Sequence, residues 1–232
     1  LEGGVTQMGM MAGPGVIDRV EIDRDTHRFD IHTIDNLPPK GICGSGMIDL
    51  AAQLFLSGMI DIRGRFQPQL CGQRLAEIDG FKHLVVVPAA ETAGGFPITI
   101  SQADLDSLIR SKAAMYTILE TITNTVGVSM KDFSTFYVAG TFGSFIRPAS
   151  AISIGMIPDL PPDTYKTLGN SSQDGATMVL TSDRVTEEID LIRDRLTYLE
   201  LNVNQDFMNR FSAAKFLPHT DLTRFPSVKP HR

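Results

Sequence analysis

The fold is decided by one stretch, FYVAGTFGSFIRP, at residues 136–148. Its first four residues are β-prone, and a Gly-x-x-Gly turn follows from Gly140 to Gly143. Pro148 stands where a helix can begin, because a first-turn residue needs no N–H. We therefore expect a strand, a turn and a helix in that order. Main-chain N–H groups that no Cβ covers can accept a flat ring or a phosphate, so the turn is a candidate binding site, with an ordinary tight turn as the alternative.

The composition is that of an ordinary globular protein. Of the 232 residues, 42% are apolar and 21% are charged, which argues against disorder and allows one large domain or two small lobes. The net charge of −6 includes no basic stripe, so we expect no nucleic-acid partner. No apolar run reaches the roughly 18 residues of a membrane span, and no signal peptide is visible, so we expect no membrane partner and a cytoplasmic location.

Cysteine chemistry contributes little. Cys43 and Cys71 lie far apart and form no Cys-x-x-Cys pair, so they can assemble neither a zinc site nor an iron–sulfur cluster, and we predict no metal ligands. The chain begins at Leu1 in mid-pattern, which suggests a piece of a longer polypeptide.

A second glycine loop, at residues 41–46, leads into an almost entirely apolar segment that ends at Gly58. We expect a buried helix over residues 47–57 with Gly58 as its C-cap. The first-turn N–H groups of such a helix can donate hydrogen bonds to phosphate oxygens, but the glycines could equally serve close helix packing. The two interpretations stay open.

A third turn of this kind follows a short strand expected at residues 165–168. Gly169 and Asn170 precede a helix expected at residues 173–180. One such turn is commonplace, but three in a single domain favour a nucleotide cleft, because triphosphate, ribose and base each need backbone at close range.

The rest of the chain also reads as alternating strands and helices. Ser101 and Asp104 form a Ser-x-x-Asp capping signal for a long helix that ends at Gly127. Residues 61–80 are expected to be an irregular excursion, and residues 218–232 a loosely held tail. The remaining expectations are a hairpin at 16–22 and 29–34, strands at 84–87, 96–100 and 198–203, and helices at 149–154, at 184–196 and after Asn204.

Several of these motifs together resemble one known family. They are GICGSGMID at 41–49, the turn at 138–143 with Pro148 behind it, LGN at 168–170 and YLEL at 198–201. This combination looks like the C-terminal domain of the reductive activators of corrinoid proteins, which belong to the superfamily of acetate and sugar kinases, heat-shock chaperones and actin. The resemblance covers nearly the whole chain. It implies an α/β, actin-like ATPase (ribonuclease H-like) fold, with a mixed sheet flanked by helices, in which residues 1–217 form a partial copy of the two-lobed unit.

The resemblance also implies a function. Family members use ATP hydrolysis to drive the one-electron reduction of an inactivated Co(II) corrinoid to Co(I) on a partner methyl-transfer protein. The implied cofactors are ATP or ADP with Mg²⁺, and a [2Fe–2S] cluster in an N-terminal domain that is not in this chain. The implied partners are a corrinoid protein and a second copy of the chain, since family members are often homodimers.

Binding roles carry over to the glycine turns. The family's adenosine-binding turn would correspond to Gly140, Thr141 and Gly143, and Gly169 with Asn170 would close the cleft. The facing helix would line the cleft with Gly41, Gly44, Ser45 and Gly46. Two parts of the pattern are missing from this sequence, namely the Asp-x-Gly-Thr phosphate loop and the ferredoxin cysteines. We therefore expect the fragment alone to bind nucleotide weakly and to be inactive.

The residue that orients the attacking water is not identified. Glu2, Asp49 and Asp174 lie near glycine turns, but we expect them to be helix-capping or surface carboxylates. Cys43 is expected to be a small packing residue. Two alternative functions stay open: a non-catalytic dimerisation or docking module, and a small-molecule kinase of the same superfamily.

Overall fold

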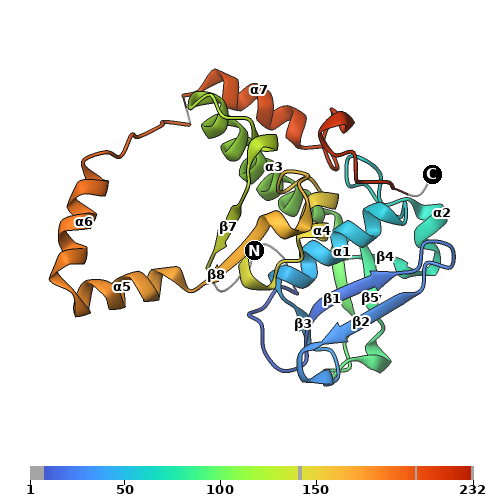
Figure 1. Ribbon diagram of the computed structural model, residues 1–232. Coiled ribbons are helices and arrows are strands. Elements are labelled where there is room, and N and C mark those ends of the chain that lie inside the picture. Colours follow the sequence, from blue (N-terminus) through green and yellow to red (C-terminus); the bar gives the residue numbers. More distant parts are fainter. Residues whose placement is uncertain (1–7, 141–142, 202, 231–232) are drawn as a thin grey trace.

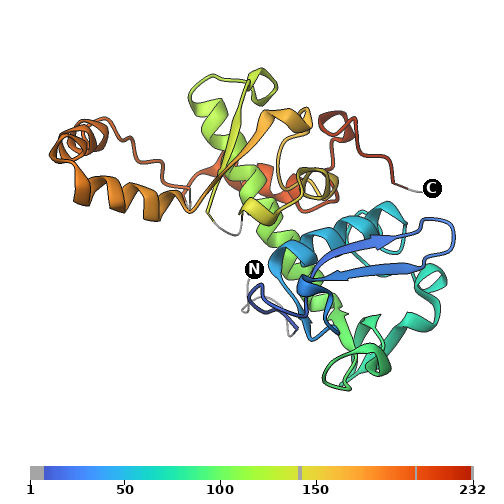
Figure 2. The ribbon, with the colours of Figure 1, turned by 60° about the horizontal axis from the view of Figure 1, so that its bottom comes forward.

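The computed structural model describes residues 8–140, 143–201 and 203–230, and over these ranges the chain is an α/β protein (Figures 1 and 2). The strands form three sheets, with orders β2-β1-β3, β4-β5-β6 and β7-β8. The strands are β1 (Val16–Ile22), β2 (Phe29–Thr33), β3 (Gly41–Ile42), β4 (Leu75–Ile78), β5 (Phe81–Val87), β6 (Ile98–Ser101), β7 (Phe136–Ala139) and β8 (Tyr165–Gly169). The helices are α1 (Gly44–Leu56), α2 (Pro68–Cys71), α3 (Gln102–Thr125), α4 (Pro148–Ser153), α5 (Ser171–Thr181), α6 (Asp183–Arg193) and α7 (Gln205–Ala214).

The first sheet is mixed, because β1 pairs antiparallel with β2 and parallel with β3. Helix α1 packs across β1. Nearly all of its residues are buried, as the apolar sequence predicts. The helix begins at Gly44 rather than at Met47, because Cys43 has extended backbone and serves as the N-cap. Gly44 and Gly46 of the second loop therefore lie in the first turn of the helix itself, whereas Gly41 lies in β3.

The second sheet is antiparallel, and the long helix α3 follows it. The capping box predicted at Ser101 is confirmed, since its hydroxyl accepts from the Asp104 N–H at 3.1 Å and its own N–H donates to the Asp104 carboxylate at 2.8 Å. The excursion expected at residues 61–80 is wrong for its second half, because β4 joins the sheet beside β5. Phe66 and Cys71, only 6% and 3% exposed, anchor the rest of this segment in the core.

The third sheet carries the stretch that decides the fold. Strand β7 pairs parallel with β8, and α4 begins at Pro148 and ends before Gly155, as predicted. The 3₁₀ turn η5 (Gly143–Phe145) lies between them. In Figures 1 and 2 this turn lies beside the N-terminal end of α1. Helices α1 and α4 pack on one another, so the third sheet is joined to the first through this pair.

The segment after α7 is not a loose tail, and the expectation for residues 218–232 is wrong for its described part. Phe225 is 2% exposed, and its ring lies 5.4 Å from that of Tyr116 on α3. Lys112, also on α3, donates from Nζ to the carbonyl oxygens of Phe216 and Pro218 at 2.5 and 2.8 Å. Tertiary contacts with α3 thus hold a segment whose own sequence is polar and proline-bearing.

Helices α5 and α6 form an arm that projects from the body (Figures 1 and 2). Neither helix has a buried residue, and their main packing is against each other. The strand predicted at 198–203 is wrong, because its described residues are in irregular chain. An alternating pattern forms a strand only where a neighbouring strand can pair with it, and none of the described strands lies beside this segment.

Candidate functional site

Two of the predicted glycines meet at the carboxyl edge of the β7–β8 pair. The strands are parallel, so Gly140 follows β7 and Gly169 ends β8 at the same edge. The Gly140 N–H donates to the Gly169 carbonyl oxygen at 2.7 Å. Their φ angles are +94° and +64°, which L side chains rarely adopt. Ligands of open α/β sheets bind outside this edge of the strands, so the two glycines stay a candidate binding site.

The space beside both glycines is open. A Cβ built on Gly140 or on Gly169 would meet no atom of the described residues within 4 Å. Gly143 differs, because a Cβ there would press on the side chain of Val138 at 2.6 Å. Thr141, predicted in the same turn, lies outside the described residues. Gly140 and Gly169 therefore leave main chain accessible, whereas Gly143 lets the turn fold back on its own strand.

Asn170 has a structural role. Its side-chain oxygen accepts from the Gln173 N–H at 3.2 Å, which makes it the N-cap of α5. Its amide nitrogen donates to the Gln173 side chain at 3.1 Å. Asn170 thereby fixes the direction in which the chain leaves the glycine pair.

The glycines of the second loop are enclosed by the protein itself. A Cβ on Gly46 would collide with the carbonyl oxygen of Ile17 in β1, and one on Gly41 would collide with the side chain of Met10. Ser45 is 6% exposed, and its hydroxyl shares a 3.1 Å hydrogen bond with the buried Cys43 thiol. Gly44 is buried in the same turn. Close packing of α1 on β1 thus accounts for Gly46, and the contact of β3 with Met10 accounts for Gly41. Cys43 is the packing residue that was expected.

A charged pair links α1 to the segment after the glycine turn. Asp49 on α1 has a side chain only 2% exposed, and its carboxylate accepts from the Arg147 guanidinium at 3.1 Å. Burial raises the pKa of Asp49, opposed by its hydrogen bond with Ser150 and by the charge of Arg147. Arg147 also lies 3.5 Å from the exposed Glu21. The expectation that Asp49 is a capping or surface carboxylate is wrong, because the packing of α4 covers it.

The other two acids do not form a catalytic cluster. Asp174 is exposed in the first turn of α5, as expected, and Glu2 lies outside the described residues. Within the described ranges, no group of three or more His, Cys, Asp or Glu side chains is placed to hold a metal ion.

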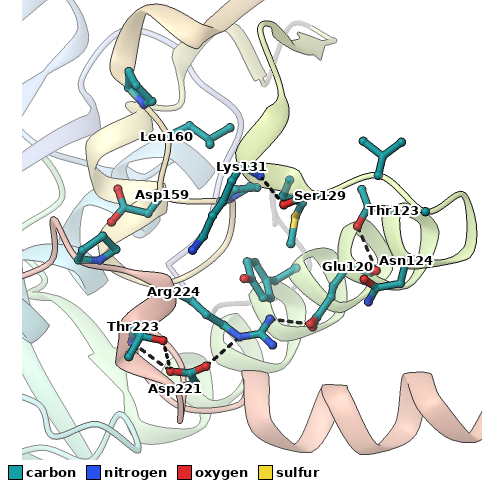
Figure 3. Close-up of a pocket in the computed structure, with 17 residues that line it drawn as sticks. Glu120, Thr123, Asn124, Ser129, Lys131, Asp159, Leu160, Asp221, Thr223 and Arg224 are labelled. Carbon is teal, nitrogen blue, oxygen red and sulfur yellow. Dashed lines mark hydrogen bonds and ion pairs between the residues drawn. The ribbon is translucent and has the colours of Figure 1, made fainter.

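A cavity of about 850 Å³ lies elsewhere, between the C-terminal end of α3, the loops before β7 and β8, and residues 221–226 (Figure 3). Arg224 lies between Glu120 and Asp221 and donates to them at 2.5 and 3.3 Å. Burial lowers the pKa of Arg224, and its hydrogen bonds to Glu120 and Tyr116 more than offset this, so the pKa lies above its ordinary value. The guanidinium is therefore charged, and its charge is balanced within the cavity wall.

This cavity is at the wrong edge for the predicted site. Residues 128–131 precede β7 and residues 158–161 precede β8, so the cavity opens at the amino edge of the strand pair. None of the predicted binding residues that the structure describes lines it. Sequence reasoning missed both Arg147 and the Glu120–Arg224 pair, whose members are 104 residues apart. No local pattern marks such partners.

The fold defines a chain of the actin-like class. Comparison with protein families supports this, because residues 1–229 match the model described as "C-terminal domain of RACo the ASKHA domain". The chain belongs to this family, which is the C-terminal domain of the corrinoid reductive activators. The resemblance drawn from the glycine motifs is confirmed, and so is the fold class.

Two relatives show how much of a larger protein the chain represents. The "Corrinoid activation enzyme RamQ" of Eubacterium limosum is 28% identical over 221 residues, which are 91% of this chain and 36% of that protein. A solved structure, "Reductive activator for corrinoid,iron-sulfur protein", is 37% identical with a TM-score of 0.90, and the match covers 97% of this chain and 36% of that one. The chain thus spans about a third of the length of these relatives. None of the helices in the described ranges is both long and apolar enough to cross a membrane.

Proposed function

We propose that this chain is the nucleotide-binding domain of an ATP-dependent activator that returns an inactivated Co(II) corrinoid protein to Co(I). Family membership and the names of the two relatives support the corrinoid part of the proposal. The observation that supports nucleotide binding is the pair of open, positive-φ glycines at the carboxyl edge of β7 and β8. Their accessible main chain fits a flat purine or a ribose, which needs backbone at close range.

ATP with Mg²⁺ would supply the driving force, as water attacks the γ-phosphorus and the bond to the β-phosphate oxygen breaks. Gly140 and Gly169 would seat the nucleoside, with Asn170 holding the second turn in place. The Asp49–Arg147 ion pair connects α1 to α4, the helix that follows the Gly140–Gly143 turn. A nucleotide bound at this turn would therefore bias how the two helices pack. The described residues form no cluster for Mg²⁺, and we place its ligands, like the phosphate loop, on parts of the protein outside them.

The electron would come from a [2Fe–2S] domain elsewhere in the full-length protein, and the acceptor would be the cobalt of a partner in methyl transfer. One electron converts Co(II) to Co(I), and nucleotide hydrolysis makes this uphill step proceed. We place the protein in the reducing cytoplasm, consistent with two buried free cysteines, and propose that it works as a homodimer.

The test uses the full-length protein with Gly140→Ala and Gly169→Ala, and with Gly80→Ala as the matched control. Gly80 also has a positive φ, +78°, and an open Cβ position, but it lies between β4 and β5. All three variants therefore carry a similar backbone strain of about 1–2 kcal/mol. We expect at least a tenfold rise in the nucleotide dissociation constant for the first two, measured with a fluorescent ATP analogue, and no change for Gly80→Ala.

The outcomes separate the candidate functions. Unchanged nucleotide affinity in Gly140→Ala and Gly169→Ala would refute the proposed site. If the wild-type protein binds no nucleotide at millimolar concentration, the non-catalytic docking module is the function that remains. A phosphorylated small-molecule product would indicate the kinase.

A further inference from the structure

Several polar side chains in the wall of the cavity in Figure 3 are already satisfied by the protein. Arg224 donates to Glu120 and Asp221, so its charge is balanced within the wall. The Thr223 hydroxyl donates to the Asp221 carboxylate at 2.6 Å, and the Thr123 hydroxyl donates to the main chain of its own helix at 2.9 Å. These groups hold the wall in shape, and none of them requires a ligand.

Two other charged side chains of the wall have no counter-ion among the described residues. Lys131, in the turn between α3 and β7, extends into the cavity (Figure 3). No described carboxylate oxygen lies within 4.0 Å of its ammonium nitrogen. The half-buried Asp159, in the loop before β8, accepts from the N–H and the hydroxyl of Ser227, both at 2.8 Å, but forms no ion pair with a described residue. The cavity therefore presents one positive and one negative group that do not neutralise each other.

The balance of charge in the wall disfavours two simpler ligands. Its described lining has three carboxylates, on Glu120, Asp159 and Asp221, against two cations, on Lys131 and Arg224, so its net charge is −1. A phosphate or another simple anion would meet this excess of negative charge. A simple cation would be repelled by the Lys131 ammonium and would leave it unpaired. A ligand that carries both charges avoids both penalties.

The rest of the wall offers apolar surface. Proline has no N–H, so its ring presents carbon atoms to a ligand and no hydrogen-bond donor. The volume of about 850 Å³ lies within the range of roughly 300–1,000 Å³ that is usual for small-molecule sites. An alkyl chain between two charged ends therefore fits this wall. Its apolar members are Val128, Met130, Pro158, Leu160, Pro161 and Pro226.

We propose that this cavity binds a small zwitterion, an organic molecule with a carboxylate at one end, an ammonium at the other and an alkyl chain between them. Lys131 binds the carboxylate, Asp159 binds the ammonium, and the proline-rich wall contacts the alkyl chain. The cavity opens at the amino edge of β7 and β8, whereas the glycine pair lies at the carboxyl edge, so the two sites are separate. The proposal does not rest on nucleotide binding.

The first test compares three probes with the same six-carbon chain on the full-length protein: 6-aminohexanoate, hexanoate and hexylamine. Each of the last two lacks one charge and leaves either Asp159 or Lys131 unpaired. By isothermal titration calorimetry we expect the zwitterion to bind at least about tenfold more tightly than either of them. The same comparison with four-carbon and eight-carbon chains finds the length that fits the cavity.

Two results would overturn the proposal. One is the absence of zwitterion binding at millimolar concentration for all three chain lengths. The other is an acid or amine that binds as tightly as the zwitterion at every length, because the second charge would then have no partner in the cavity.

The second test assigns each end of the zwitterion to its residue. Lys131→Gln should lower zwitterion affinity to that of the alkylamine and leave alkylamine affinity unchanged. Asp159→Asn, whose amide can still bond to Ser227, should lower zwitterion affinity to that of the alkyl acid and leave alkyl acid affinity unchanged. The matched controls are Lys166→Gln and Asp163→Asn, which are exposed and do not line the cavity.

Circular dichroism checks that all four variants fold. If the controls weaken zwitterion binding as much as Lys131→Gln and Asp159→Asn do, or if neither of these two variants weakens it, the zwitterion binds elsewhere and the proposal fails. Neither test measures nucleotide affinity, so this failure is distinguishable from a failure of the glycine site.

Discussion

Replacing Lys112 by methionine should change how the stability of this protein depends on pH. The Lys112 side chain is fully buried on α3, and its Nζ holds the carbonyl oxygens of Phe216 and Pro218. Burial lowers the pKa of Lys112 from 10.5 to about 7. The unfolded chain therefore binds more protons than the folded chain between these two values, so the free energy of unfolding should rise as the pH rises from 7 toward 10.5.

The magnitude follows from the two pKa values. At about 1.4 kcal/mol for each pH unit, a folded pKa of about 7 against 10.5 gives an upper limit of about 5 kcal/mol across the window. The two carbonyl oxygens favour the charged ammonium and reduce this figure. Lys112→Met abolishes the titration and leaves both carbonyls without their donor, which costs about 1–3 kcal/mol each. We therefore expect Lys112→Met to be less stable than the wild type, and its free energy of unfolding to change less between pH 7 and 10.

The assay is urea unfolding followed by circular dichroism at several pH values from 7 to 10. Lys82→Met is the matched control, because Lys82 is exposed on β5. Subtracting each variant from the wild type cancels groups that titrate alike in both. If the Lys112→Met and wild-type curves run parallel across the window, the buried lysine does not titrate as argued and the reasoning fails.

Two further substitutions test the link between α1 and its neighbours. Arg147→Gln leaves the buried Asp49 carboxylate without its cation, and we expect a loss of about 1–3 kcal/mol at pH 7. Since the pKa of Asp49 is already raised, the loss should shrink as the pH falls to 5, and an equal deficit at both pH values in thermal unfolding would contradict this. Gly46→Ala drives a Cβ into the Ile17 carbonyl and should destabilise by about 1–3 kcal/mol, measured by urea unfolding. Wild-type stability would show that close packing is not what requires this glycine.

Local signals predicted the parts of the fold that depend on neighbouring residues in the sequence. The Ser101 capping box, the start of α4 at Pro148 and the Asn204 cap of α7 are each set within a few residues, and all three are confirmed. The signal at residues 198–203 failed for the opposite reason, because a strand requires a partner that only the fold can supply.

Long-range contacts explain the other errors. Lys112 and Pro218 are 106 residues apart, and Asp49 and Arg147 are 98 apart. Neither pair leaves a pattern in one sequence, so the C-terminal segment was expected to be loose and Asp49 was expected at the surface. The glycines show the same limit. Gly46 and Gly140 both stand in glycine-containing turns of the sequence, yet the space beside Gly46 is filled by Ile17, whereas no described residue fills the space beside Gly140.

The arm formed by α5 and α6 begins next to the candidate nucleotide site. It starts at Ser171, directly after Gly169 and its neighbour Asn170, and the Asn170 cap fixes the start of α5. A nucleotide at Gly169 would thus lie against the base of the arm. Binding that favours one orientation of α5 would change how the arm is presented to a partner protein, and by thermodynamic reciprocity a partner that holds the arm would change nucleotide affinity by the same factor. The position of the arm therefore offers a physical route by which nucleotide state could affect partner binding.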